Sequence, residues 1–244
     1  MTIAGRFATA LDSVTDPELA RPELLPVRLA RACVSMLPVD GVGLSLLAVD
    51  GHRVPLGAAP EEAALAERLQ FTVGTGPCAS AESCRHPVFA VEEEMLRRWP
   101  VFAGLLHRET PYRAVVALPL ELGLSGSAAI DLYFRRSADV AALDVFEAMA
   151  VGELVGSALS DAALWSTWRA ERGPDWLHGP TPQERTAAWA AVDRIAAELG
   201  VGPDTAVALL RARAYVLGVP ADQVAADVRS GRLPVSDLQV PTET

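Results

Sequence analysis

A stretch rich in proline and glycine, residues 171–182, constrains the fold of this chain more than any other feature of its sequence. It reads Glu-Arg-Gly-Pro-Asp-Trp-Leu-His-Gly-Pro-Thr-Pro and holds three prolines and two glycines. Proline lacks the backbone N–H that helices and sheets use, and glycine loses much conformational freedom on folding, so this composition interrupts regular structure. We therefore expect a linker at 169–182 that separates a larger domain at 14–168 from a small one at 183–233.

The segment before the linker mixes strand-like and helical patterns. Short apolar runs typical of strands stand at 41–49, 52–58, 87–91, 113–121 and 127–134, and Asp50-Gly51 between the first two is a strong hairpin signal. Helical patterns cover 14–37, 60–69, 97–108 and 139–168. Helices and paired strands in this order predict an α+β fold in which one antiparallel sheet is flanked by helices.

The segment after the linker contains helical patterns alone. Apolar residues at helical spacing predict three helices over 183–199, 203–217 and 220–229, and Gly200 and Gly218 stand where the first two should end. Each is too short to be stable in isolation, so the helices must pack on one another or on a partner. We expect an all-α three-helix domain.

Composition and charge limit the function classes. The 244 residues are 50% apolar and carry a formal net charge of -10, which disfavours non-specific binding of nucleic acid, so any such contact needs a local basic face. No apolar stretch is long enough to span a bilayer, and the first residues lack the pattern of a signal peptide. The expectation is a cytoplasmic protein with no membrane contact.

The sequence shows no pattern of catalytic or metal-binding residues. Cys33, Cys78 and Cys84 are an odd set without a paired framework, which indicates free thiols. The four histidines are scattered, so neither a metal site nor another cofactor is expected. No Ser-His-Asp or Cys-His spacing occurs, and we predict no enzymatic activity.

Two features near the middle of the chain allow more than one interpretation. Residues 74–78, Gly-Thr-Gly-Pro-Cys, lack the Gly-Lys-Ser/Thr of a Walker motif and favour a tight turn before a helix that begins with proline. Trp99 and Tyr133 could stack on a planar ligand or could be core residues with a polar tip.

Several of these segments, taken in order, resemble a GAF domain of the type found in actinobacterial regulators. The matching pieces are Val-Gly-Thr-Gly-Pro-Cys at 73–78, Arg-Trp-Pro at 98–100 with Phe102, Ala-Leu-Pro-Leu at 117–120, and Ile-Asp-Leu-Tyr at 130–133, within residues 28–165. The resemblance implies a domain that senses an unknown small molecule or serves as a dimerisation platform. It places six residues at the ligand pocket: Gly76, Pro77, Cys78, Trp99, Asp131 and Tyr133.

Residues 183–233 resemble an ANTAR domain, an RNA-binding module that controls transcription antitermination. The matching pieces are Gly200, Ala-Val-Ala-Leu-Leu-Arg at 206–211, and Val-Ala at 224–225. The resemblance implies a homodimer that binds paired RNA hairpins, with the long helix from residue 139 carrying the signal as a shift between two arrangements. Five residues are candidates for the RNA-binding face: Arg185, Ala191, Arg194, Arg211 and Arg213.

One departure from the ANTAR pattern favours an alternative. The first helix of that family usually carries Ala-Lys-Gly on its RNA face, whereas this chain has Ala191, Val192 and Asp193 there. Over 183–233, six arginines are balanced by six acidic residues, so the segment has no net charge. The alternative is a degenerate module that acts through protein contacts without RNA. A further alternative, a GAF-fold sulfoxide reductase, would need exposed cysteines with lowered pKa values.

Overall fold

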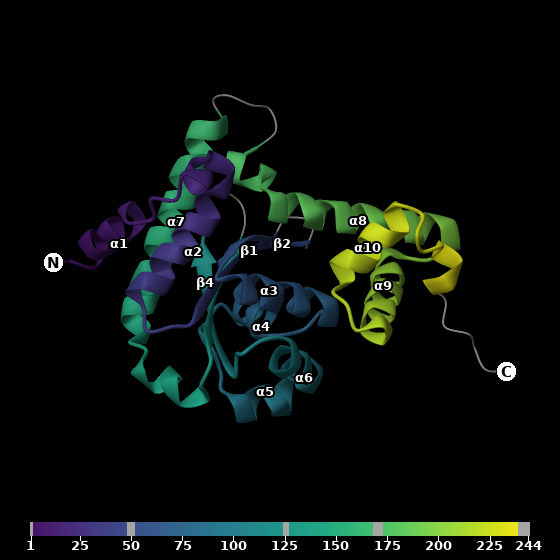
Figure 1. Cartoon of the computed structure of the whole chain (residues 1–244), viewed down its shortest axis with the longest axis horizontal. Helices are drawn as coiled ribbons and strands as arrows, with labels where there is room; N and C mark the ends of the chain where they lie inside the picture. Colours follow the sequence, from purple (N-terminus) through teal and green to yellow (C-terminus); the bar gives the residue numbers. More distant parts are fainter. Residues whose placement is uncertain (1, 48–51, 124–126, 168–172, 239–244) are drawn as a thin grey trace.

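The computed structural model describes residues 2–47, 52–123, 127–167 and 173–238 (Figure 1). A five-stranded antiparallel sheet with strand order β2-β1-β5-β4-β3 forms its centre. The strands are β1 (Gly41–Leu47), β2 (Arg53–Ala59), β3 (Val88–Ala90), β4 (Ala114–Glu121) and β5 (Ser127–Phe134). The prediction of one antiparallel sheet is confirmed, while the Asp50-Gly51 turn lies outside the described residues.

Helices cover both faces of this sheet, which matches the second part of the fold prediction. One face carries α1 (Ile3–Asp12), α2 (Leu25–Met36) and α7 (Val145–Thr167), and the other carries α3 (Glu61–Val73), α4 (Pro77–Cys84), α5 (Glu92–Arg98) and α6 (Pro100–Glu109) (Figure 1). Successive strand residues point to opposite faces. In β5, Ile130 and Leu132 therefore enter the core under α2 and α7, whereas Tyr133 enters the core under α3 and α6.

The C-terminal segment forms α8 (Pro180–Leu199), α9 (Pro203–Leu217), α10 (Ala221–Arg229) and a short 3-10 turn at Val235–Leu238. We call residues 180–238 the helical module. Gly200 and Gly218 end α8 and α9 in the left-handed conformation, as their positions predicted. The core of the helical module is shared with the sheet domain, because Phe71 of α3 is one of its buried members. Figure 1 shows the module beside the edge strand β2.

Proline and capping residues explain where the helices depart from expectation. The predicted helix over 14–37 is α-helical only in α2. Pro17 and Pro22 begin two short 3-10 turns before it. Proline favours the start of a helix over its interior, which explains the interruption. The predicted helix from residue 139 begins at Val145, after Asp144 accepts hydrogen bonds from the backbone N–H groups of Phe146 and Glu147. Helix α1 lies before the expected start of the domain at residue 14.

Residues 169–172 of the expected linker at 169–182 lie outside the described residues, and the remainder is partly structured. Residues Asp175–His178 form a 3-10 turn, and Pro180 is the first residue of α8, where a missing N–H costs nothing. Trp176 is 3% exposed, and its Nε1 donates a hydrogen bond to the backbone oxygen of Leu159, 3.1 Å away. The proline-rich stretch therefore packs against the sheet domain through its tryptophan. None of the described helices has the length and apolar character needed to cross a membrane.

Replacing Trp176 by alanine should destabilise the fold, because it removes a large buried ring and the indole N–H that donates to the Leu159 carbonyl. We expect a loss of about 3–5 kcal/mol in the free energy of unfolding, measured by urea denaturation. Tyr215 of α9 is 59% exposed, and Tyr215→Ala is the control, an aromatic ring removed from the surface, with an expected change within about 0.5 kcal/mol. Equal losses in the two variants would show that Trp176 does not anchor this segment.

Candidate functional site

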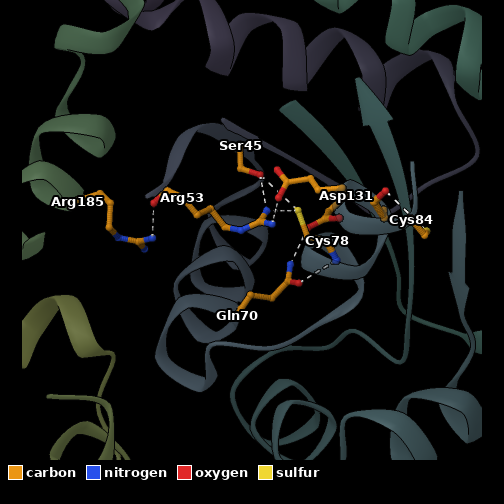
Figure 2. A network of polar contacts seen from close by, with 9 residues as sticks. Ser45, Arg53, Gln70, Cys78, Cys84, Asp131 and Arg185 are labelled. Carbon is orange, nitrogen blue, oxygen red and sulfur yellow. Dashed lines mark hydrogen bonds and ion pairs between the residues drawn. The ribbon is translucent and has the colours of Figure 1, made fainter. Parts of the chain in front are cut away.

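A cluster of polar side chains is buried between the sheet and helices α3 and α4 (Figure 2). Gln70 of α3 is its centre: its Nε2 donates to Asp131 Oδ2 at 2.6 Å, and its Oε1 accepts from the backbone N–H of Cys78 at 3.2 Å. The hydroxyl of Tyr133 donates to Glu67 Oε1 at 2.7 Å. The cluster thus joins strand β5 to two helices through hydrogen bonds rather than apolar contact.

Local sequence explains how a glutamate reaches the sheet. Glu67 and Gln70 are three residues apart, so both project from one face of α3. Beneath them, β1 carries Gly43, and a Cβ there would lie 2.1 Å from Glu67 Oε1. A side chain at position 43 would therefore expel the carboxyl from its place, which accounts for the glycine in the middle of a strand.

Arg53 supplies the positive charge of the cluster. Its Nη1 donates to Ser45 Oγ at 3.0 Å and also contacts the Cys78 sulfur, while its Nη2 pairs with Glu82. Burial lowers the pKa of Arg53, but the acidic groups around it, Cys78, Glu82 and Asp131, together raise this pKa by more, so the guanidinium stays protonated. Because burial of an isolated charge is costly, Arg53 and the carboxyls hold one another in place.

The ionisation of these groups is dominated by burial. Burial, followed by the charge of Asp131, raises the pKa of Glu67 well above its ordinary value. Burial also raises the pKa of Asp131, although the Arg53 charge opposes this effect. Burial, followed by the charge of Asp131, raises the pKa of the Cys78 thiol. Burial thus favours a proton on one carboxyl of the Glu67–Asp131 pair and a neutral Cys78 thiol, which is not activated as a nucleophile.

An open cavity of about 380 Å³ adjoins the cluster on the side of the helical module. Its polar and aromatic wall comes from both parts of the chain: Arg53, Gln70, Phe71, Glu82, Trp189 and Arg211. Two of these residues, Glu82 and Trp189, each have a buried polar atom, Oε1 and Nε1, without a hydrogen-bond partner among the described residues. Such atoms are costly to leave unpaired, which makes the cavity a candidate site for a polar ligand.

The structure brings most of the predicted pocket residues to this region. Cys78, Asp131 and Tyr133 are buried in the polar cluster, Gly76 lines the cavity, and Pro77 is buried as the first residue of α4. Trp99 stands apart. It borders a second hollow that shares Gly76 with the cavity, and the Arg98 guanidinium lies 4.3 Å from the centre of its ring.

Sequence reasoning missed the residues that give the site its charge. Ser45, Arg53 and Glu67 were assigned only to strands and a helix, and the expected end of α3 at residue 69 excluded Gln70 and Phe71. The spacing of Glu67 and Gln70 on one helical face was the available signal. It could not be recognised without knowing that this face lies on a sheet.

The candidates for an RNA-binding face do not form one exposed surface. Arg185 is 1% exposed and forms an ion pair with Asp222, with an N–O distance of 2.8 Å. It also donates a hydrogen bond of 3.3 Å to the backbone oxygen of Arg53. Its guanidinium lies 3.6 Å from the centre of the Phe71 ring. Arg211 Nε donates to the backbone oxygen of Phe71 at 2.8 Å. Both arginines therefore face the sheet domain.

The other three candidates differ in their surroundings. Ala191 is fully buried in the core of the helical module. Arg194 is exposed and pairs with Glu198 at 2.6 Å, while Arg213 is partly buried on α9. Among the described residues, no group of three or more histidine, cysteine or acidic side chains is arranged to hold a metal ion.

Of the known proteins compared with this chain, only solved structures show a similarity. No family model and no curated protein matches the chain. A GAF domain of a phosphoenolpyruvate-protein phosphotransferase from Coxiella burnetii is 14% identical (TM-score 0.44), with 68% of this chain and 99% of that chain covered. A domain assigned to a two-component sensor histidine kinase of Sinorhizobium meliloti is 15% identical (TM-score 0.42; 70% and 99% covered). The GAF3 domain of a Synechocystis protein, in its photoproduct state, is 13% identical (TM-score 0.38; 69% and 100% covered).

The pKa of Glu82 makes stability depend on pH. Burial raises it to about 7, although the Arg53 charge opposes this effect, whereas an unfolded glutamate titrates near ~4.3. The folded protein thus holds this proton more tightly, so the stabilisation is complete at low pH and is lost as pH rises through about 7. Between these two pKa values, the free energy of unfolding falls as pH rises. Glu82→Gln should make this slope shallower, by at most about 1.4 kcal/mol per pH unit.

The exposed Glu153 on α7 offers a control with the same change of charge. Urea denaturation across this pH range should give Glu153→Gln the slope of the natural chain. A Glu82→Gln variant with that same slope would show that Glu82 does not titrate in the folded state at these pH values.

The three thiols should react at different rates. Cys84 is exposed, whereas Cys33 and Cys78 are buried, and burial raises the pKa of Cys33 to about 12. With a chromogenic disulfide reagent at mildly alkaline pH, we expect the folded chain to release one equivalent quickly and Cys84→Ser to release none until denaturant is added. A fast thiol that persists in Cys84→Ser would reveal an accessible Cys78 and revive the reductase alternative.

Proposed function

We propose that this chain is a cytoplasmic signalling regulator in which a GAF-type sensor domain controls a helical module that binds RNA hairpins. Three observations support the sensor assignment: the GAF-like segments of the sequence, the antiparallel sheet with helices on both faces, and the polar cluster with its adjoining cavity. The order of segments in α8, α9 and α10 supports an ANTAR-like module.

The contact between the two parts carries this proposal. Phe71 lies at the end of α3 and is 2% exposed, enclosed by the Arg185 guanidinium and by the Trp189 ring, whose centre is 5.4 Å from its own. The Thr72 hydroxyl accepts a hydrogen bond of 2.9 Å from the backbone N–H of Ala221. The sensor domain therefore completes the core and the hydrogen bonding of the module.

This docking also covers arginine side chains of the module. RNA-binding proteins gain much of their affinity by placing accessible arginine and lysine side chains against phosphates. Arg185 and Arg211, the two candidates at Phe71, face the sensor domain instead. The docked arrangement is thus the state that does not bind RNA, and release of the module exposes its arginines.

A homodimer is the natural form of such a regulator, since hairpin pairs present two equivalent sites. Helix α7 offers a surface for it: Phe146, Met149, Leu164 and Trp165 are large apolar residues that α7 leaves exposed. Exposed apolar side chains gathered on one element are typical of an interaction surface. A second copy of this chain is the partner that we assign to it.

The alternative is a module that acts through protein contacts alone. Asp193 is exposed on α8, where the family carries its RNA face, and an acidic side chain repels phosphate. Docking of the module on its own sensor domain is itself a specific protein contact. The choice between the two outputs rests on RNA binding by the released module.

Phe71→Ala should release the module and raise RNA affinity, because it removes the ring that both parts enclose. In filter-binding titrations against a library of two-hairpin RNAs at two salt concentrations, we expect the variant to bind about tenfold more tightly than the natural chain, with affinity that falls as salt rises. Phe89→Ala, at a phenylalanine of β3 that is 44% exposed, is the control and should behave as the natural chain.

Thr72→Val should weaken the contact between the module and the rest of the chain less than Phe71→Ala does, since it removes one hydrogen bond and keeps the volume of the side chain. It should raise RNA affinity in the same direction by a smaller factor. If folded Phe71→Ala and Thr72→Val chains bind no RNA even at low salt, the RNA-binding output is wrong and the protein-contact output replaces it.

A further inference from the structure

We propose that the cavity between the sensor domain and the helical module binds a small planar organic anion, an aromatic carboxylate, through Arg211 and Trp189 of the module and Glu82 of the sensor domain. A ligand held from both sides would stabilise the docked arrangement. That regulatory consequence rests on the proposed function, whereas binding of the anion does not.

The charge of the cavity points to an anion. Three guanidinium groups lie at or near it, and two are paired with carboxylates: Arg53 with Glu82 and Arg185 with Asp222. Arg211 forms no ion pair with any described carboxylate, and its Nε is bound only to the Phe71 carbonyl. Burial, followed by the charge of Arg185, lowers the pKa of Arg211. A partly buried cation without a counter-charge is a costly arrangement that a bound anion would relieve.

The unpartnered atoms define which groups the ligand must carry. Trp189 Nε1 is buried without a partner and, as an indole N–H, can only donate, so it requires an acceptor such as a carboxylate oxygen. Glu82 is 5% exposed in its side chain, and its Oε1 is likewise unpaired. Below neutral pH the Glu82 carboxyl can donate to the anion, and when ionised it can accept from a ligand hydroxyl.

The apolar walls favour a ring over an inorganic anion. Phe71 and Trp189 meet edge to face, with planes inclined at 72°, and Leu47 and Ala79 add apolar surface beside the polar Thr75 and Ser83. A cavity of about 380 Å³ lies in the size range of small-ligand sites. Aromatic rings prefer to pack edge to face or offset against such walls. An aromatic carboxylate therefore matches the walls, the donors and the charge together.

The experiment uses the full chain and four probes: 4-hydroxybenzoate, its neutral amide 4-hydroxybenzamide, the cation benzamidine, and inorganic phosphate. Binding is followed by calorimetry and by the indole N–H resonance of Trp189, assigned by its loss in Trp189→Phe. We expect 4-hydroxybenzoate to move this resonance downfield and to bind at least about tenfold more tightly than the other three probes.

Variants locate the site. Arg211→Gln removes the unpaired charge and should weaken 4-hydroxybenzoate binding about tenfold or more, while Arg213→Gln, with the same change on the same helix outside the cavity, should leave it unchanged. Trp189→Phe keeps a ring in the wall, loses the N–H, and should weaken binding several-fold. It serves as the second variant should Arg211→Gln fail to fold.

Three results would overturn the inference: no movement of the Trp189 resonance with 4-hydroxybenzoate, equal affinity of the amide, or undiminished binding by the folded Arg211→Gln and Trp189→Phe chains. Phosphate that binds as tightly, with the same resonance shift, would overturn the aromatic part of the assignment. Failure of RNA binding with intact carboxylate binding would count against the proposed function alone, so the two proposals fail separately.

Discussion

The burial of Phe71 is the constraint on which the arrangement of this chain depends. It belongs to α3, yet its ring lies in the core of the helical module, where Arg185 and Trp189 pack against it. A module of three short helices cannot build a large core alone, and a borrowed aromatic side chain adds apolar area that it lacks. Contact with the sheet domain therefore adds to the stability of the module.

Arg53 extends this contact into the polar cluster. Its guanidinium contacts Ser45, Cys78 and Glu82, and its backbone oxygen accepts a hydrogen bond from Arg185 of the module. The residue that lies beside the buried carboxyls thus also offers its own backbone carbonyl, on the edge strand β2, to the module. A change in the protonation of the cluster therefore acts on the side chain of Arg53, and a movement of the module acts on its backbone oxygen.

Sequence patterns predicted elements well and contacts between distant elements poorly. The GAF-like segments pointed to Asp131, Tyr133 and Cys78, which the structure brings together in one cluster. Arg185 and Arg211 were read as candidates for RNA contact, because a sequence shows that an arginine is on a helix but not what covers it. The proline-rich stretch predicted an interruption correctly, but burial of Trp176 depends on the sheet domain and leaves no local signal.

The geometry also favours a route for the signal that the sequence did not suggest. The length of α7 suggested that it carries the signal to the module, yet the module packs on α3 and β2 (Figure 1). Helix α3 holds Glu67 and Gln70 in the polar cluster, and Phe71 and Thr72, the next residues along the chain, in the contact with the module. A rigid helix transmits a displacement along its length, so a ligand that moves Gln70 must also move Phe71. In the proposed dimer, the exposed apolar side chains of α7 would hold two copies together, while α3 would set whether each module is docked.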